Sequence, residues 1–280
     1  MSLTFGEYYP EVKAEFRFEV DAVLFSEQSQ FQKIEVVQSK GFGRMLLIDG
    51  FVMLTDRDEF VYHEMISHTP LFVHPNPKNV LVIGGGDGGT VRECLRHPNV
   101  SHVDLVDIDE LVTKACVEFF PAIAGKLDDP RVSCFFEDGV AFVKRKSNAY
   151  DLIIVDSTDP ISVGEGLFSR EFYRDCFNAL KSDGILVNQS ESPAWLPKIV
   201  KNIQVKLRDI FPQFHFYHAS IPTYPSGHWA FGFAAKTLHP LNNFDQQRYD
   251  QLNLDFNYYN DGIHRASFVL PTFFRKLLDE

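Results

Sequence analysis

The sequence predicts an α/β protein, in which a small antiparallel β domain precedes a doubly wound domain with a parallel sheet. Between Glu15 and Asp56, apolar and polar residues alternate, and glycines punctuate the segment. From about Pro75 onward the chain carries compact apolar runs, most of them separated by stretches of helical length. Alternation is typical of half-buried antiparallel strands, whereas apolar runs that alternate with helices indicate a parallel sheet covered on both faces.

The N-terminal domain is placed at residues 1–62. Phe16, Phe18 and Val20 interleave with charged residues, and the segments FQKIEVVQ, RMLLIDG and FVMLTD follow. Glycines between these segments permit tight turns, so we expect short antiparallel strands.

The second domain is placed at residues 63–280. Its expected strands are VLVIGG, VDLVDID, VSCFFED, DLIIVDS and GILVNQS, followed by FHFYHASI and HWAFGFAAK, which are joined by the turn PTYPSG. The segments DELVTKACVEFF, SREFYRDCFNALK and PKIVKNIQVKLRDIF have apolar residues at helical spacing and should cover the sheet.

The amino-acid composition limits the kinds of molecule that the protein is expected to bind. The formal net charge is -11, from 38 acidic and 27 basic side chains, which argues against a nucleic-acid partner and permits a cationic ligand. The sequence has no apolar run near the roughly 18 residues that span a bilayer, and its start does not resemble a signal peptide. We therefore expect a cytoplasmic protein without a membrane partner.

The four cysteines do not suggest a metal site. Cys94, Cys116, Cys134 and Cys176 form no C-x-x-C pair and have no neighbouring histidines at ligand spacing. We expect them to be buried free thiols.

A glycine-rich turn follows the first apolar run of the second domain. Gly84 to Gly89 contains Asp87 and precedes a segment that can start a helix. Such turns occur in NAD, flavin and adenosylmethionine proteins alike, and also as purely structural turns. Asp87 would repel a pyrophosphate, and also the carboxylate of a methionine moiety, but would attract an amine.

Two further acidic groups follow the next strands. Asp107 comes about twenty residues after the glycines, where a carboxylate can accept hydrogen bonds from ribose hydroxyls. Asp138 and Gly139 end the strand after that. Parallel strands end at one edge of the sheet, so these groups should meet along a ligand-binding edge.

Together the motifs GGGDGG, YDLIIVDSTDP and IPTYPSG, in this order, resemble those of the spermidine synthase (polyamine aminopropyltransferase) family. The segment FQKIEVVQSKGFGRMLLIDGFVMLTDRDEFVYHEM also resembles its N-terminal β domain and the link into a Rossmann-like, methyltransferase-type domain. The resemblance implies transfer of the aminopropyl group of decarboxylated S-adenosylmethionine to a diamine, without metal or cofactor, by a homodimer or homotetramer.

The resemblance also assigns roles to individual residues. Those implied for the cosubstrate are Gln32, Gly84, Gly86, Asp87, Asp107, Asp138, Gly139 and Val163. Those implied for the diamine are Tyr62, His63, Asp156, Ser157, Thr158, Asp159, Gln189 and Tyr224, with Glu191 as a further candidate. Asp156 matches the family's proton acceptor.

The chain departs from the family pattern at two places. The family often has glutamate where Asp107 stands, and it usually has Gly-Pro where this chain has Ser162 and Val163. The shorter acid reduces the reach to the ribose, and the second change leaves open how the following loop closes.

A proton acceptor is what this chemistry demands. A free alkylammonium has a pKa of about 10.4, so at neutral pH it is protonated and cannot attack the carbon next to a sulfonium.

The identity of the acceptor amine is less certain than the type of reaction. Putrescine suits a cleft with two carboxylates best, whereas cadaverine, agmatine and spermidine stay open as acceptors. A diamine N-methyltransferase and a non-catalytic nucleoside-binding paralogue are the alternative functions.

Each site residue also has a structural interpretation. The DxxD segment from Asp156 could cap a helix, and His63 and Tyr62 could be packing residues in the core.

Overall fold

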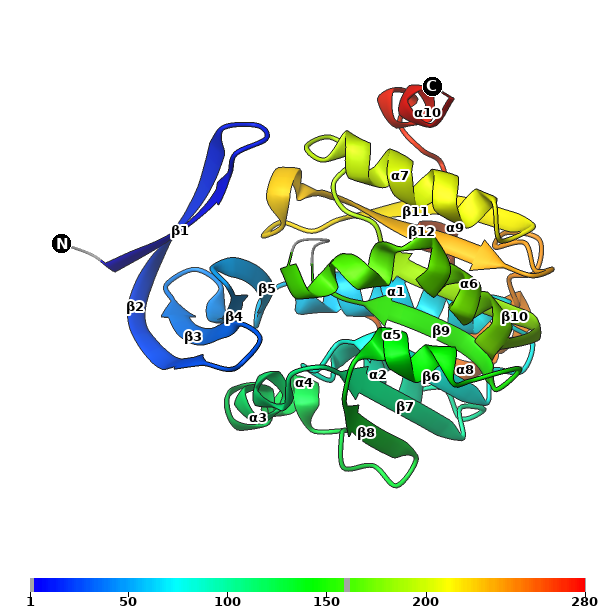
Figure 1. Ribbon diagram of the computed structural model, residues 1–280, viewed down its shortest axis with the longest axis horizontal. Helices are drawn as coiled ribbons and strands as arrows, with labels where there is room; N and C mark the ends of the chain where they lie inside the picture. The colour runs from blue at the N-terminus through cyan, green and yellow to red at the C-terminus, as the bar shows by residue number, and fades with distance from the viewer. Residues whose placement is uncertain (1–2, 159–161, 280) are drawn as a thin grey trace.

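The computed structural model describes residues 3–158 and 162–279 and contains two β sheets (Figure 1). The first is a five-stranded antiparallel sheet whose order follows the chain. Its strands are β1 (Leu3–Tyr9), β2 (Ala14–Gln28), β3 (Lys33–Ser39), β4 (Gly43–Ile48) and β5 (Phe51–Thr55). The small antiparallel domain predicted from the alternating pattern is thereby confirmed.

A seven-stranded sheet forms the larger part of the molecule, with the order β11-β12-β10-β9-β6-β7-β8. Strands β6 to β10 run parallel, and β12 pairs antiparallel with both β10 and β11. The bounds are β6 (Asn79–Gly84), β7 (His102–Asp107), β8 (Val132–Phe136), β9 (Tyr150–Asp156), β10 (Leu180–Gln189), β11 (Gln213–Ser220) and β12 (His228–Ala235). All seven apolar runs assigned to this domain are strands, so the predicted α/β fold class is confirmed.

Helices cover both faces of this sheet (Figure 1). One face packs against α1 (Glu59–Val73), α2 (Gly89–Leu95), α8 (Gln246–Leu252) and α9 (Asp261–Ser267). The other packs against α5 (Gly139–Lys144), α6 (Arg170–Ala179), α7 (Pro197–Arg208) and α10 (Thr272–Asp279). Among the described residues, no helix is both long enough and apolar enough to cross a membrane.

The predicted helices are present as α3 (Glu110–Phe119), α6 and α7. Helix α1, in which every residue from Val61 to Val73 is buried, was not among the helices predicted from apolar residues at helical spacing. A helix that is buried all round lacks the apolar stripe by which helices are recognised, and α1 also contains Pro70.

The two sheets meet through α3 and the short α4 (Pro121–Ala124). Val112, Cys116 and Phe120 pack against Ile34 and Leu46 of the small sheet in one buried cluster. The side chain of Ser29 also donates to Asp109 over 2.6 Å. The expected division between residues 62 and 63 falls inside α1, and that boundary stays a prediction.

The expectation for the cysteines is correct for three of the four. Cys94, Cys116 and Cys176 are buried free thiols, but Cys134 is exposed. It lies on β8, the last strand of the sheet, which has a neighbouring strand on one side only and is poorly covered. Burial of Cys134 was therefore wrongly predicted.

Candidate active site

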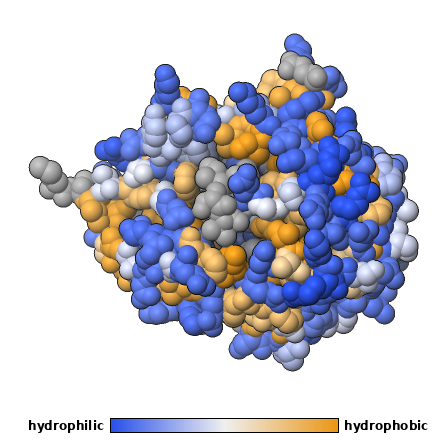
Figure 2. Space-filling view, in the orientation of Figure 1, coloured by the Kyte–Doolittle hydropathy of each residue, from blue (hydrophilic) through white to orange (hydrophobic). Residues whose placement is uncertain are grey.

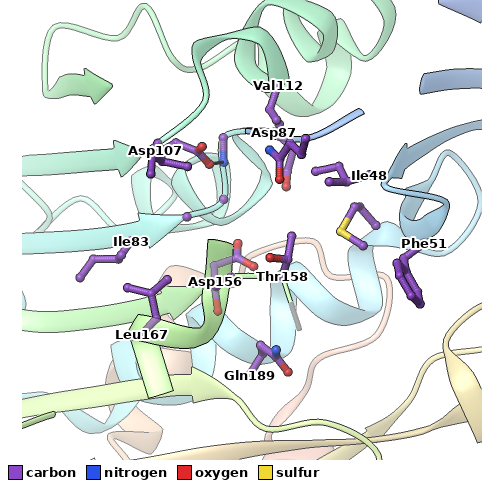
Figure 3. A pocket seen from close by; sticks show the side chains of 18 of the residues that line it. Ile48, Phe51, Ile83, Asp87, Asp107, Val112, Asp156, Thr158, Leu167 and Gln189 are labelled. Carbon is purple, nitrogen blue, oxygen red and sulfur yellow. Dashed lines mark hydrogen bonds between the residues drawn. The ribbon is translucent and has the colours of Figure 1, made fainter. Parts of the chain in front are cut away.

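A cavity of about 430 Å³ lies between the two sheets, at the carboxyl ends of β6, β7, β8 and β9. The small sheet contributes Ile48, Phe51 and Met53 to its wall. In Figure 3, Ile48 and Phe51 face the cavity from one side, whereas Asp107 and Ile83 lie at the other, with Asp87 and Asp156 between them. The edge predicted from the strand ends is thus the wall of a single site.

The glycine-rich turn brings the ends of three strands into contact. Gly84 has a φ of +78°, and a Cβ there would lie 2.0 Å from the carbonyl oxygen of Asp156. A Cβ on Gly85 would lie 2.7 Å from Oδ2 of the same aspartate, and a Cβ on Gly86 would lie 2.7 Å from Oδ2 of Asp107. The distance from Gly84 to a backbone atom leaves no room for a Cβ, so glycine is required there, whereas a Cβ on Gly85 or Gly86 would displace the aspartate carboxylate that it faces.

Asp107 is held by the turn that it faces. Its Oδ2 accepts the backbone N–H of Gly86 over 3.0 Å, and its Oδ1 accepts that of Asp109 over 2.8 Å. Burial, together with the charges of Asp109 and Asp87, raises the pKa of Asp107 to about 6 despite these two hydrogen bonds. The carboxylate is therefore fixed in the cavity wall and titrates close to neutral pH.

Asp87 has a cationic neighbour. Nε2 of His63 lies 3.2 Å from its Oδ1, which also accepts the backbone N–H of Gly89 over 2.7 Å. Nδ1 of His63 lies 2.5 Å from Glu59, and Glu59 is paired with Arg92 over 2.9 Å. Burial alone would lower the pKa of His63, but Asp87 and Glu59 outweigh it and raise that pKa to about 10. His63 is therefore a charged group of the site and not a neutral core residue.

Asp156 ends β9 and is fully engaged by hydroxyl groups. The Tyr62 hydroxyl donates to its Oδ1 and the Thr90 hydroxyl to its Oδ2, each over 2.7 Å. Burial and the charge of Asp87 raise the pKa of Asp156, while His63, Thr90 and Tyr62 oppose the shift. The Asp156 side chain faces the cavity and, among the described residues, accepts from these hydroxyls and caps no helix, whereas the other aspartate of the segment, Asp159, lies outside the described residues.

Further predicted residues line the same cavity: Gln32, Asp138, Gly139, Ser157, Thr158, Gln189 and Tyr224. The Asp138 side chain is also the N-cap of α5, where it accepts the backbone N–H of Val140 over 2.8 Å. Glu191 is buried next to Gln189, whose side-chain amide donates to it over 3.2 Å. The geometry therefore brings most of the predicted set together.

For two of the predicted binding residues, Asp159 and Val163, the structure gives no side-chain position relative to the cavity. Asp159 lies outside the described residues. Val163 belongs to the 3-10 helix η1 (Ser162–Phe168), but its side chain is outside what the structure describes. Their roles stay predictions, although Gly164, Gly166 and Leu167 of the same segment line the cavity.

Several residues of this site were not predicted from the sequence, among them Glu7, Tyr9, Thr90 and Trp229. Glu7, Tyr9 and Trp229 line the cavity, and Thr90 contacts Asp156 directly. Glu7 and Tyr9 lie on β1, in a segment whose alternation does not single out a carboxylate. Thr90 directly follows the glycine-rich motif, and only the distance to β9 reveals its contact.

A second group of ionisable residues lies at the opposite end of the strands. Nε2 of His74 lies 3.6 Å from Asp183 and 4.0 Å from Asp151, a spacing that could also suit a metal ion. However, Nδ1 of His74 accepts the backbone N–H of Asn76, so Nε2 carries the proton. Asp151 is moreover engaged by Lys181 over 2.9 Å. We interpret this group as a structural cluster around the ion pair of Asp151 and Lys181, beside which burial lowers the pKa of His74.

Two family models match the chain. The Spermine/spermidine synthase domain matches residues 59–246, and the Spermidine synthase tetramerisation domain matches residues 4–56. The first match alone spans more than half of the chain. The chain belongs to the spermine/spermidine synthase family.

Members of this family are similar over nearly the whole chain. A polyamine aminopropyltransferase of Alkaliphilus metalliredigens is 52% identical over 94% of this chain and 93% of its own length. One of Clostridioides difficile is 52% identical over 100% of both. The resemblance inferred from the motifs is thereby confirmed, and the chain is an enzyme of the transferase class.

Solved structures of spermidine synthases have the same fold. A crystal structure of spermidine synthase in complex with the transition state analogue AdoDATO superposes with a TM-score of 0.97 at 39% identity, covering 99% of this chain and 95% of the other. The spermidine synthase of Thermotoga maritima gives a TM-score of 0.95 at 39% identity, covering 99% and 94%.

The tetramerisation match falls on the strands that expose apolar side chains. Leu3, Tyr8, Val23 and Leu24 on β1 and β2 are each more than a third exposed. Figure 2 shows apolar surface over these N-terminal strands, and further apolar patches among hydrophilic surface elsewhere on the visible face. Apolar patches of this kind mark contact surfaces, which agrees with an oligomer built through the small sheet.

Proposed function

We propose that the chain transfers the aminopropyl group of decarboxylated S-adenosylmethionine to putrescine, giving spermidine and 5'-methylthioadenosine. One observation carries the proposal: Asp87 and Asp156 present carboxylates to the same cavity. One ligand atom from each of these residues and from His63 lies within 4.8 Å of the others. Two anionic groups at this spacing suit a reaction in which an acceptor amine must approach the propyl carbon of a donor that itself carries an amine.

The donor's nucleoside would occupy the part of the cavity formed by Asp107, Asp138 and Gly139. Asp107 would accept the ribose hydroxyls, because its carboxylate is already oriented by the amides of Gly86 and Asp109. Asp87 would bind the amine of the aminopropyl group through the oxygen that does not face Gly89. This places the sulfonium between the glycine-rich turn and Asp156.

In the transfer itself, the neutral amine of the acceptor attacks the propyl carbon attached to the sulfonium. The new C–N bond forms as the C–S bond breaks, and the sulfur leaves as a neutral thioether. The Asp156 carboxylate takes the proton that the acceptor's ammonium loses as it becomes the nucleophile, and the product nitrogen stays protonated as a secondary ammonium. The sulfonium is already an activated leaving group, so we propose that the reaction needs neither a metal nor a further cofactor.

The far amine of putrescine would reach the end of the cavity formed by Glu7, Tyr224 and Trp229. Glu7 is 3% exposed and accepts a hydrogen bond from the Tyr9 hydroxyl. The Tyr224 hydroxyl donates to the backbone carbonyl of Met53 over 2.6 Å, which fixes the ring against the small sheet. A buried carboxylate beside aromatic walls is suited to a second ammonium.

Substitution of Glu7 tests this placement. We expect Glu7→Gln to raise KM for putrescine about tenfold, because hydrogen bonds to charged groups contribute about 1.5–3 kcal/mol. The KM for the donor should stay within about twofold. Glu15→Gln, at an exposed carboxylate on β2 that pairs with Arg17, is the matched control and should change neither constant. Equal increases for both substrates would contradict the placement of the far amine.

The pH dependence of nucleoside binding tests the role of Asp107. Its pKa of about 6 means that the carboxylate is ionised above this pH and protonated below it. Since the ionised form is the stronger acceptor for ribose hydroxyls, the affinity for 5'-methylthioadenosine should fall about tenfold from pH 7 to pH 5. Titration calorimetry measures this fall. Asp107→Asn should bind weakly and without that slope, and an unchanged slope would exclude Asp107 as its cause.

An amine panel tests the proposed function as a whole. Release of 5'-methylthioadenosine should depend on added amine, with kcat/KM highest for putrescine among putrescine, cadaverine, agmatine and spermidine. A higher value for another amine would correct the acceptor and leave the transfer intact. Tight nucleoside binding without turnover for any amine would instead favour a non-catalytic paralogue.

A further inference from the structure

Thr90 contacts the proposed proton acceptor from a different element of the fold. It is the second residue of α2 and is fully buried. Its hydroxyl donates to Oδ2 of Asp156, on β9, over 2.7 Å. Because the Tyr62 hydroxyl from α1 donates to Oδ1 over the same distance, the two carboxylate oxygens are held from two helices.

This contact is not the default for a threonine in a helix. A threonine hydroxyl in a helix commonly returns to the backbone carbonyl three or four residues earlier, which for Thr90 would lie in the glycine-rich turn. Thr90 instead reaches across to a residue 66 positions later in the chain. On the other side, the absence of a side chain at Gly85 gives room for the same Oδ2, which would lie 2.7 Å from a Cβ there. The carboxylate oxygen is therefore confined between Gly85 and Thr90.

A carboxylate without such confinement rotates easily. The terminal torsion of aspartate is broad, so one hydrogen bond to Oδ1 leaves the plane of the group poorly defined. Proton transfer in the transition state requires the accepting lone pair to face the nitrogen, and small misplacements are costly. A second donor on Oδ2 sets that plane.

We infer that Thr90 is a positioning residue, whose hydroxyl orients the Asp156 carboxylate toward the attacking amine. This inference rests on the proposed function, since it assumes that Asp156 accepts the proton. Thr90 lies outside the set of residues that line the cavity, so it acts through Asp156 and not on the substrates.

The groups around Asp156 determine what loss of this hydroxyl does to its titration. Tyr62 and His63 face it from α1, Asp87 from the glycine-rich turn and Cys94 from α2. On β10, Asn188 lies opposite Val155 and carries an amide, which does not titrate. Burial and Asp87 raise the pKa of Asp156, and the Thr90 hydrogen bond opposes them. Removing the hydroxyl should raise this pKa further.

The decisive variant is Thr90→Val, which has nearly the same shape and no hydroxyl. We expect kcat to fall about tenfold, while KM for both substrates stays within about twofold. Activity requires ionised Asp156, so the acid limb of kcat against pH should move up by about one unit. Thr90→Ser keeps the donor and should restore kcat to within about threefold, with the wild-type acid limb.

A matched control separates this effect from a general loss of a buried hydrogen bond. Thr55 is also fully buried and donates to Asp58 over 2.6 Å, and neither residue is among those that line the cavity. Thr55→Val should lower thermal stability and leave the acid limb of kcat in place. If Thr90→Val does not fold, the pair Thr90→Ser and Thr90→Ala gives the same comparison, because its members differ chiefly by one hydroxyl.

The outcomes distinguish this inference from the proposed function. A folded Thr90→Val enzyme with wild-type kcat and pH profile would overturn the role of Thr90, as would equal activity of the serine and alanine variants. If Asp156→Asn is nearly inactive at the same time, the proposed function stands. If Asp156→Asn retains turnover, it is the assignment of Asp156 that fails.

Discussion

Asp156→Asn should reduce turnover at least about 100-fold, which is the usual scale for the loss of a general base. Asparagine preserves the shape of the side chain, and its amide oxygen can accept one of the two hydroxyl hydrogen bonds that Tyr62 and Thr90 donate to Asp156, but it cannot take a proton from the attacking amine. Steady-state assays with saturating substrates measure the effect, and binding of 5'-methylthioadenosine verifies that the site is folded.

Asp183→Asn provides the matched control for this variant. Asp183 lies on β10, the strand adjacent to β9, but at the end of the sheet away from the cavity, and its side chain is 43% exposed. We expect its turnover to stay within about twofold of wild type. Near-normal turnover of Asp156→Asn would show that another group, or water, accepts the proton.

Asp87→Asn should reduce kcat/KM for the decarboxylated donor at least about 100-fold. A buried ammonium would lose its anionic partner, and breaking such a pair commonly costs about 3–5 kcal/mol. The asparagine oxygen can still accept the backbone N–H of Gly89, which preserves the turn. Kinetics at varied donor concentration give the measurement.

The product of the reaction supplies an internal control for this second variant. 5'-Methylthioadenosine contains the nucleoside and the thioether but no aminopropyl amine, so its affinity for Asp87→Asn should stay within about threefold of wild type. If both ligands lost affinity equally, Asp87 would act through the shape of the turn and not through the amine.

The sequence carried enough information to predict the edge where the site lies. Gly84 to Gly89, Asp107 and Asp156 all follow apolar runs, and strand ends of a parallel sheet must meet at one edge. Asp87 was informative because a carboxylate in a turn of this kind is incompatible with a bound pyrophosphate. The glycine-rich turn, Asp107 and Asp156 lie close together because the strands that they follow are parallel neighbours in one sheet, as the alternation of apolar runs and helical stretches predicts.

The contacts that complete the site from other parts of the chain could not be predicted from the sequence. Glu7 reaches the cavity only because the first β ribbon lies against the larger domain, where Tyr9 contacts the ring of Trp195 with centroids 5.3 Å apart. Nothing local to β1 predicts that contact. The network of His63, Glu59 and Arg92 depends likewise on the packing of α1 against α2, and α1 itself lacks an amphipathic pattern.

The structure shows how the chain holds Asp107, the residue that stands where the family often has glutamate. Aspartate at position 107 is shorter than the glutamate that the family often has, and it is held by the amides of Gly86 and Asp109. Gly86 itself is tied to α3, where the Thr113 hydroxyl donates to its carbonyl over 2.8 Å. The shorter acid is thus held by backbone groups, which fixes the position of the carboxylate that would accept the ribose hydroxyls in the proposed function.

The most direct test of aminopropyl transfer compares two donors with the wild-type enzyme and putrescine. Products formed from decarboxylated S-adenosylmethionine and from S-adenosylmethionine are quantified by mass spectrometry under identical conditions. We predict spermidine and 5'-methylthioadenosine in equal amounts from the decarboxylated donor, and at least about 100-fold slower reaction with S-adenosylmethionine, whose carboxylate would face Asp87. Methylated putrescine formed from S-adenosylmethionine, without spermidine from the decarboxylated donor, would contradict the account.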